Sequence, residues 1–357
     1  MKPITRREAL HHVASGVGLL AASPALAASA PAERSPIGIG MHSYGYQWRE
    51  AKARRAGAKF HDALTFLQYA HRLGAAGVQV TIGDNDRAYA ERIKAEAEKS
   101  GLYFEAQFQS PKDDTDVDRF ERDVRLARDA GATVFRTACL SGRRYETFKS
   151  AEEFGEFAAR SRNSLRLAEP VLKRHRLRMA VENHKDWLVP ELLEIVRKFS
   201  SEWVGICVDT GNSIALMEDA MNVIEAYAPF AFSVHLKDMA LDEYGDGFLL
   251  SEVPLGRGFL SISRVVQILR RANPAVQLNL EMITRDPLRI PCLTDAYWAT
   301  MRSTPASQFA QTLGTAKQNI SKIPLPRLSD LPAEKQLWLE DEHVRASLAF
   351  AKTQLRP

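Results

Sequence analysis

The sequence contains few cysteines and no long block of charge of one sign. Its 357 residues include three cysteines, Cys139, Cys207 and Cys292, which lie far apart and show no CxxC spacing. An odd number of cysteines cannot form a complete disulfide framework, so we expect small buried hydrophobic side chains and a fold stabilised by packing. The formal net charge is only +4, and no dense basic run with interleaved aromatic residues occurs. A nucleic-acid partner is therefore not expected.

The sequence also lacks an apolar run long enough to cross a bilayer, which takes about 20 residues, so we expect no stable membrane insertion. The apolar stretch over residues 13–22 is short. It follows the pair Arg6 and Arg7 and precedes an Ala-Leu-Ala cleavage pattern that ends at Ala27. This order is typical of a signal peptide over residues 1–27, and the arginine pair favours the twin-arginine route, with the general secretory route as the alternative. We therefore expect an exported, periplasmic protein.

An Ala-, Ser- and Pro-rich linker over residues 28–36 precedes a regular alternation of short apolar runs and amphipathic helical stretches. The eight runs are residues 37–42, 78–82, 103–108, 133–138, 177–182, 204–209, 231–236 and 276–282. The helical stretches are residues 62–73, 87–99, 117–129, 151–174, 190–199, 215–226 and 262–272. Alternating strands and helices predict an α/β fold with a parallel sheet, and eight units predict a (β/α)8 TIM barrel over residues 37–285. No GxGxxG motif follows the first strand, which disfavours a dinucleotide-binding fold.

Residues 286–357 form a predicted C-terminal extension. We expect one helix over residues 305–318 and a last helix over residues 332–353, joined by a proline-rich link. The extension is expected to pack on the barrel or on a partner subunit, and a homodimer is possible.

Each of the last four predicted strands ends in a residue type that binds metal ions: Glu182, Asp209, His235 and Glu281. The active site of a (β/α)8 barrel lies at the carboxyl ends of its strands. Because side chains alternate along a strand, all four residues fall on the side with the smaller or more polar residues, which should face the barrel interior. Three carboxylates cannot share a buried site without a cation. The set therefore predicts one divalent metal ion, Mn²⁺ first, with Mg²⁺, Co²⁺, Zn²⁺ or Fe²⁺ as alternatives.

The segments that carry these residues resemble the sugar phosphate isomerase/epimerase family, which has a xylose-isomerase-like barrel. The matching segments read VENH from Val181, VDTGN from Val208, VHLKD from Val234, PLGRG from Pro254 and LE from Leu280. The resemblance covers roughly residues 37–285. It implies that Glu182, Asp209, His235 and Glu281 hold one divalent metal, and that Glu182 and Glu281 act as the catalytic acid/base pair.

The resemblance leaves the reaction open. Many epimerases of this family have a histidine three residues after the aspartate of the sixth strand, whereas this sequence has Asn212. A metal-dependent isomerase or epimerase acting on a sugar or keto-sugar through an enediolate-like intermediate is the first hypothesis. A lyase or dehydratase acting on a keto-sugar or keto-glycoside is the second, and a non-catalytic periplasmic sugar-binding barrel is the third. The DNA-repair branch of the superfamily is excluded, since the extra histidines of its multi-metal cluster are missing.

Further candidates surround the predicted metal site. Lys237 lies two residues after His235 and is expected to steady an enediolate or a substrate oxygen, with an ion pair to Asp238 as the alternative. An exported location would favour an unphosphorylated sugar as the small-molecule partner. The candidate substrate-binding residues are His42, Gln107, Arg136, His184, Asn212, Arg257 and Trp298, the last together with Tyr297 as a lid.

Overall fold

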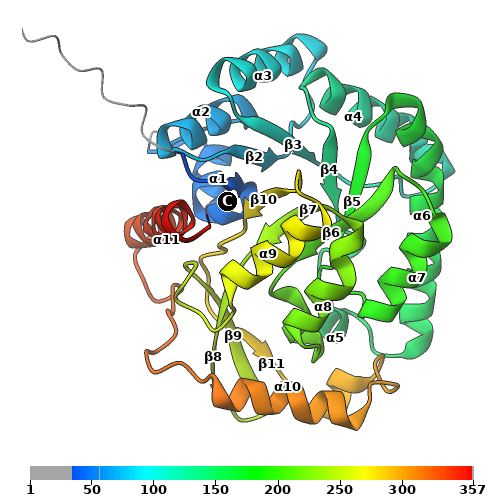
Figure 1. Cartoon of the computed structure of the whole chain (residues 1–357), viewed down its shortest axis with the longest axis vertical. Helices are drawn as coiled ribbons and strands as arrows, with labels where there is room; N and C mark the ends of the chain where they lie inside the picture. The colour runs from blue at the N-terminus through cyan, green and yellow to red at the C-terminus, as the bar shows by residue number, and fades with distance from the viewer. Residues whose placement is uncertain (1–33, 56, 356–357) are drawn as a thin grey trace, which may run out of the picture. The chain divides into compact units, whose positions relative to one another are not determined.

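The computed structural model describes residues 34–55 and 57–355. The predicted signal peptide and most of the predicted linker lie outside these residues, so both stay predictions. The described chain is built around a closed barrel of eight parallel strands (Figure 1), which confirms the predicted (β/α)8 fold.

The barrel strands follow one another around the ring in sequence order. They are β1 (Gly38–Gly40), β2 (Gly77–Val80), β3 (Tyr103–Gln107), β4 (Val134–Thr137), β5 (Arg178–Glu182), β6 (Val204–Asp209), β7 (Ala231–Leu236) and β10 (Gln277–Leu280). The ring closes where β1 pairs with β10 in parallel, with Gly38 opposite Asn279. Seven strands fall within the predicted apolar runs and β2 begins one residue before its run, because alternating outward residues such as Val78 and Val80 are fully buried against the helices.

Helices cover the outside of the barrel. They are α1 (Gly45–Lys52), α2 (Ala63–Leu73), α3 (Arg87–Ser100), α4 (Val117–Asp129), α5 (Arg144–Thr147), α6 (Ala151–His175), α7 (Val189–Phe199), α8 (Ala220–Tyr227) and α9 (Ile262–Ala272). Side-chain caps begin several of them: Asp62 accepts from the Thr65 N–H at the start of α2. The same helix ends at Gly74, whose φ of 75° lies in the left-handed region that glycine favours.

The predicted helix over residues 215–226 is wrong at its start. The structure has a short 3₁₀ helix (Asn212–Leu216), which ends at Met217 with a φ of 58°. Asp219 then caps α8 by accepting from the Asn222 N–H. The apolar period of this segment therefore belongs to two short elements, because a left-handed residue and a new cap separate them.

A small antiparallel sheet was not predicted. It consists of the hairpin β8 (Asp238–Tyr244) and β9 (Gly247–Val253) together with β11 (Leu288–Ile290). The hairpin follows β7 directly, and its side chains Leu241, Phe248 and Leu250 are buried. The sheet thus extends the barrel at the end where the predicted metal ligands lie.

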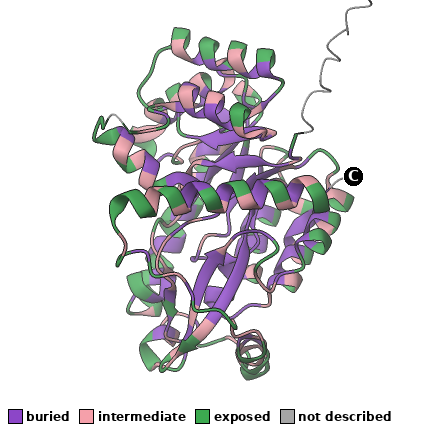
Figure 2. Ribbon diagram, turned by 90° about the vertical axis from the view of Figure 1, so that its left-hand side faces the viewer, coloured by how far each residue is buried: buried purple, intermediate pink, exposed green. Residues whose placement is uncertain are grey.

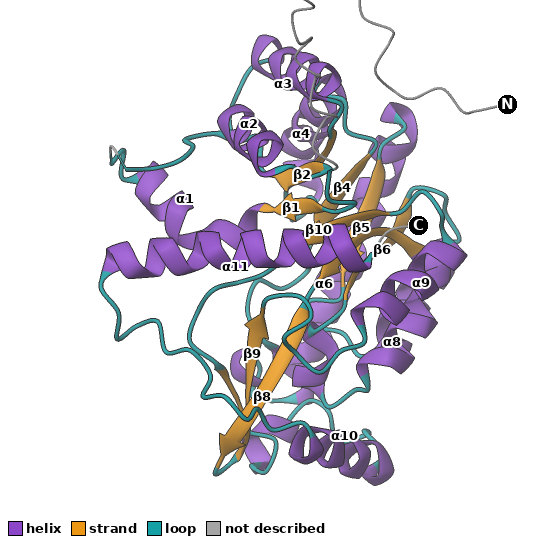
Figure 3. Cartoon of the chain, turned by 60° about the vertical axis from the view of Figure 1, so that its left-hand side comes forward, coloured by secondary structure: helices purple, strands orange, loops and turns teal. Residues whose placement is uncertain are grey.

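The C-terminal extension contains both predicted helices, α10 (Ala306–Gln318) and α11 (Ala333–Gln354). Helix α10 lies beside the hairpin (Figure 3), where Thr312 Oγ1 donates to the carbonyl of Met217. Helix α11 lies against α1 (Figure 3), and Glu340 accepts hydrogen bonds from the backbone N–H groups of Tyr46 and Gln47.

The barrel strands are buried almost throughout, and the exposed residues lie on the outer faces of the helices and in loops (Figure 2). The described helices include none that is both long and apolar enough to pass through a membrane.

Candidate metal centre and active site

Four side chains meet at the carboxyl ends of β5, β6, β7 and β10. Glu182, Asp209, His235 and Glu281 each offer one possible ligand atom, and these atoms all lie within 4.8 Å of one another. The first three side chains are completely buried, and Glu281 is 3% exposed. The last inward position of each strand, or the one just after it, thus supplies one member of the cluster.

The imidazole of His235 lies at the centre of this cluster. Its Nδ1 atom lies 3.3 Å from Glu281 Oε1, 3.5 Å from Glu182 Oε1 and 3.9 Å from Asp209 Oδ2. This buried Nδ1 has no hydrogen-bond partner among the described residues. One ring nitrogen and three carboxylates around one point form a donor set that suits a divalent cation, so the residues present fit such an ion.

A buried polar layer inside the barrel orients the imidazole. Gln79 Nε2 donates to Glu105 Oε2, which fixes the amide orientation, and Gln79 Oε1 then accepts from His235 Nε2 at 2.6 Å. Ser233 and Asn279 also donate to Glu105 Oε2. With Nε2 held in this way, Nδ1 is the ring nitrogen that faces the carboxylates.

Neighbouring cations keep two of the carboxylates ionised. Burial opposes the ionisation of Glu182, but Arg136 and His235 outweigh it and hold its pKa well below the usual value. Burial likewise opposes the ionisation of Glu281, and His235 and Lys237 outweigh it, so its pKa also lies well below the usual range. Both groups are therefore carboxylates at neutral pH.

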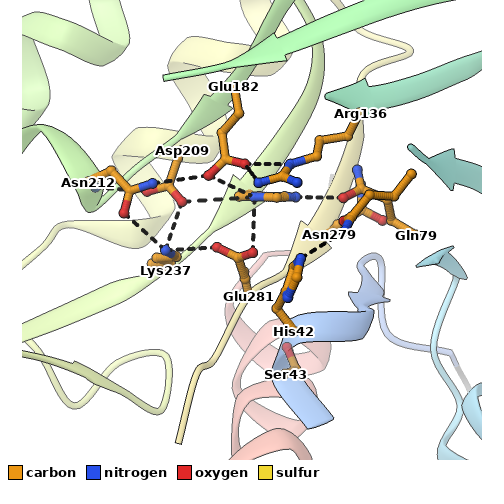
Figure 4. Close-up of polar contacts among 12 residues, drawn as sticks. His42, Ser43, Gln79, Arg136, Glu182, Asp209, Asn212, Lys237, Asn279 and Glu281 are labelled. Atoms are coloured by element: carbon orange, nitrogen blue, oxygen red, sulfur yellow. Dashed lines mark hydrogen bonds and ion pairs between the residues drawn. The ribbon is translucent and has the colours of Figure 1, made fainter. Parts of the chain in front are cut away.

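Lys237 bridges two of the candidate ligands. Its Nζ lies 2.9 Å from Asp209 Oδ2 and 2.8 Å from Glu281 Oε2 (Figure 4). Burial opposes the charged form, but the carboxylates of Asp209 and Glu281 outweigh it and raise the pKa of Lys237. The alternative ion pair with Asp238 is not formed.

Asp238 instead holds the loop that contains Arg257. Its Oδ2 accepts from the backbone N–H groups of Gly256 and Gly258, and a Cβ at Gly258 would lie 2.1 Å from Asp238 Oδ1. Arg257 itself is exposed and lies near His343 of α11. The structure thus anchors this loop and does not bring Arg257 to the four-residue cluster.

Two of the predicted substrate-binding residues contact the cluster directly. Arg136 forms an ion pair with Glu182 (Figure 4). Asn212 Nδ2 donates to Glu182 Oε1 at 3.1 Å, and its Oδ1 accepts from both Lys185 and Lys237. Asn212, at the position where many epimerases of the resembled family have a histidine, therefore links a candidate ligand to two lysines.

One pair of side chains and a further histidine lie beside the cluster. His42 Nε2 lies 2.9 Å from Gln107 Nε2, and burial lowers the pKa of His42 although Glu281 opposes this shift. His184 follows Glu182 by two residues, and burial lowers its pKa to about 3, so it is a neutral imidazole at the edge of the site. These side chains could accept or donate hydrogen bonds to substrate hydroxyl groups.

Trp298 lies in the C-terminal extension. Its indole N–H donates to the carbonyl of Cys292 and its ring packs on Tyr297 and Phe309. The buried Tyr297 hydroxyl donates to the carbonyl of Ala215. The structure shows packing contacts for both residues, and a lid role for Trp298 stays a prediction.

Sequence reasoning missed several residues of the site. Gln79 and Glu105 occupy inward positions of β2 and β3, which the same alternation used for the later strands would have identified. Lys185 and Arg285 lie in loops after β5 and β10, and Glu252 lies on the unpredicted β9. No spacing or periodicity in the sequence marks these three.

Three similar proteins stand out in comparisons with known proteins. The 3-oxo-isoapionate decarboxylase of Pectobacterium atrosepticum is 31% identical over 108 residues, which cover 30% of this chain and 39% of that relative. A crystal structure of D-psicose 3-epimerase with D-tagatose, from Clostridium cellulolyticum H10, has a TM-score of 0.58 at 12% identity and covers 90% of this chain and 99% of that one. A crystal structure of a xylose isomerase-like TIM barrel protein from Mycobacterium smegmatis, in complex with magnesium, has a TM-score of 0.51 at 14% identity. The match covers 80% of this chain and 98% of that one.

At these identities the two solved structures support the fold alone, and the curated relative is matched over less than half its length. The family comparison covers more of the chain. Residues 67–303 match one family model, and this segment includes seven of the eight barrel strands and all four residues of the cluster. The chain therefore belongs to the xylose isomerase-like TIM barrel family.

Proposed function

We propose that this protein is a divalent-metal-dependent isomerase or epimerase that acts on a sugar or keto-sugar by proton transfer. The observation that carries the proposal is the convergence of Glu182, Asp209, His235 and Glu281, with the unpartnered Nδ1 of His235 at the centre. Mn²⁺ is the preferred ion for this mixed oxygen and nitrogen set, with Mg²⁺, Co²⁺, Zn²⁺ or Fe²⁺ as alternatives.

The side chains then divide the chemistry between them. A divalent ion would polarise a substrate carbonyl and acidify the neighbouring C–H bond. Glu182 and Glu281 lie on opposite sides of the cluster (Figure 4), so one carboxylate can remove the proton and the other can return it. Lys237 presents an ammonium group to the same region and would stabilise a developing oxyanion.

A second candidate is a lyase, either a dehydratase or a decarboxylase. The specific observation in its favour is the partial match to a relative named as a decarboxylase of a 3-oxo acid. Loss of water from a keto-sugar, or of carbon dioxide from a 3-oxo sugar acid, also passes through an enolate-type intermediate, so the same residues could serve it. Isotope analysis separates the candidates: deuterium from heavy water enters an otherwise intact sugar in the first reaction, and carbon dioxide or water is lost in the second.

A non-catalytic sugar-binding role is the least supported alternative, because binding alone does not require two ionised carboxylates facing one point. Export to the periplasm is part of the proposal and depends on residues 1–27 of the sequence.

Elemental analysis of the purified protein tests the metal centre. We expect about one equivalent of divalent metal in the parent, and its loss in His235→Ala and Glu281→Ala with the circular dichroism spectrum unchanged. His61→Ala, at an exposed position, is the matched control and should keep the metal. A parent that remains metal-free after reloading would contradict the proposal.

A further inference from the structure

A second group of charged side chains lies next to the candidate metal ligands. Lys185 and Lys237 both donate to Oδ1 of Asn212, so their ammonium groups are close neighbours. Lys237 and Arg285 in turn approach the same oxygen, Oε1 of Glu252, with Lys237 Nζ at 3.7 Å. Three cationic side chains are therefore linked in a row through two shared acceptors. The row runs from Lys185 through Lys237, which contacts the candidate metal ligands, to the partly exposed Arg285.

Lys185 is the unusual member of this row. It is only 3% exposed, and within residues 34–55 and 57–355 no carboxylate lies within ion-pair distance of its Nζ. Its hydrogen bond goes to the neutral amide of Asn212. Burial, followed by the nearby charges of Lys237 and Arg285, lowers the pKa of Lys185 to about 7, and the carboxylates of Glu252 and Asp209, which are not within ion-pair distance, only partly oppose this shift. A buried ammonium group without a counter-charge is costly and is stabilised by any anion that reaches it.

The sum of the charges around the site also favours an anionic ligand. The carboxylates are Glu182, Asp209, Glu252 and Glu281, and the cationic groups are Arg136, Lys185, Lys237 and Arg285. With Lys185 protonated and the imidazole of His235 neutral, as it is in a metal ligand, these four carboxylates balance the four cationic groups before the charge of the ion is counted. A divalent cation would leave two positive charges without compensation in a site that is almost closed to water, so the substrate must supply negative charge.

We propose that the substrate of this site carries a carboxylate, which Lys185 binds beside the metal centre with Arg285 at the open side, so that the substrate is a keto-sugar acid. This inference rests on the proposed metal-dependent function and specifies its substrate class. Proton transfer from the substrate to Glu182 or Glu281 leaves the net charge of the site unchanged, so the negative charge comes from the substrate itself, and a carboxylate is a group that the single ammonium group of Lys185 can pair with. A phosphate dianion would need more free donors than Lys185 alone offers, because the fork of Arg285 is already engaged by Glu252.

Three ligands with the same carbon skeleton test the proposal by calorimetric titration of the Mn²⁺-loaded protein. D-Fructose, D-fructuronate and D-fructose 6-phosphate differ only in the group on the last carbon, which is a hydroxyl, a carboxylate or a phosphate ester. A fourth ligand, 2-keto-D-gluconate, places the carboxylate at the other end of the same skeleton. We expect at least one of the two acids to bind about tenfold or more tightly than D-fructose, as a charge-assisted contact allows.

Substitution of the lysine then assigns the contact. Lys185→Met should weaken binding of the acid about tenfold or more while changing D-fructose affinity less than about twofold. Lys185→Arg should keep much of the preference, because it retains the charge. Lys173→Met, at an exposed position near the end of α6, is the matched control and should leave every affinity unchanged.

Three outcomes would overturn the inference: equal affinity for the neutral sugar and both acids, including no measurable binding of any of them up to about 10 mM; a parallel loss of acid and sugar binding in Lys185→Met; or a preference for the phosphate ester over both acids.

Failure of the proposed function would look different, because the parent would take up no metal in the titration with Mn²⁺ alone. The charge balance also predicts that the preference for the acid falls when the metal is removed with a chelator. Metal uptake without any preference for the acid would therefore reject the carboxylate proposal and leave the metal centre in place.

Discussion

The two nitrogen atoms of His235 have different surroundings, and this difference decides what the residue can do. Nε2 is fixed by Gln79 inside the barrel, whereas Nδ1 faces three carboxylates. A histidine that binds a metal ion typically donates its other N–H to a protein oxygen, which fixes both the tautomer and the ring orientation. Gln79 is therefore a positioning residue that acts through His235.

Replacing Gln79 tests this role. Gln79→Met keeps the approximate size of the side chain but removes the acceptor for His235 Nε2, so we expect the dissociation constant for Mn²⁺ to rise about 10- to 100-fold. Calorimetric titration with Mn²⁺ measures the effect, and Gln311→Met on the exposed face of α10 is the control. If Gln79→Met lowered thermal stability but left Mn²⁺ affinity unchanged, Gln79 would be a packing residue only.

Ionisation of the buried Glu105 makes the free energy of unfolding depend on pH. Burial raises its pKa to about 7, against the opposing hydrogen bonds from Ser233, Gln79 and Asn279. The folded protein thus holds a proton that the unfolded chain releases near pH 4.5, so the stabilising contribution is complete below that pH and is lost as pH rises through about 7. We expect the free energy of unfolding of the parent to fall relative to that of Glu105→Gln by about 3 kcal/mol between about pH 5 and pH 8.

Denaturant unfolding at several pH values measures this difference. Glu98→Gln, on the exposed side of α3, should follow the parent at every pH. Parallel pH profiles for the parent and Glu105→Gln would show that Glu105 ionises in the folded state as it does in the unfolded chain.

At the scale of elements, Asp341 is a second carboxylate, beside Glu340, that attaches α11 to the first barrel units. Asp341 Oδ1 accepts from the hydroxyl groups of Tyr44 and Tyr69, and Oδ2 lies 2.8 Å from Lys59 Nζ. These partners come from the segments around α1 and α2, so the last helix and the first barrel units depend on the same group.

Asp341→Asn keeps the shape of the side chain and removes its charge. Hydrogen bonds to a charged group are each worth about 1.5–3 kcal/mol, and the amide keeps some of them, so we expect a loss of about 2 kcal/mol in the free energy of unfolding. Asp330→Asn, at an exposed position before the helix, should cost far less. A loss no larger than that of the control would mean that the other contacts of α11, including the hydrogen bonds of Glu340, hold the helix without Asp341.

The sequence predicts those elements that are marked by a pattern within their own residues. The barrel strands and most of their helices follow from hydrophobic periodicity and caps, and the alternation of side chains brings Glu182 and Glu281 to one end of the barrel. The β8–β9 hairpin was missed because it sits inside a connection where a helix was expected next, although Gly245 and Asp246 form a recognisable turn. Glu252 depends on that hairpin and Lys185 on the path of a loop, so neither position follows from periodicity.

At the scale of the whole molecule, the polar side chains of the described barrel are concentrated in its interior and at one end. Ser233 and Asn279 donate to the buried Glu105 inside the barrel. The four candidate ligands come from the carboxyl ends of β5, β6, β7 and β10, so a single ion would contact the ends of four strands at once.

Metal binding should therefore stabilise the fold as a whole. An ion that binds the native state but not the unfolded chain raises the free energy of unfolding by about 2.7 kcal/mol at 100 times its dissociation constant, which corresponds to about 5 °C in a domain of this size. We expect Mn²⁺ to raise the melting temperature of chelator-treated protein by about this amount and to leave that of His235→Ala unchanged. A shift of equal size in both proteins would place the stabilising ion elsewhere, because a site that has lost its central nitrogen cannot bind with the same affinity.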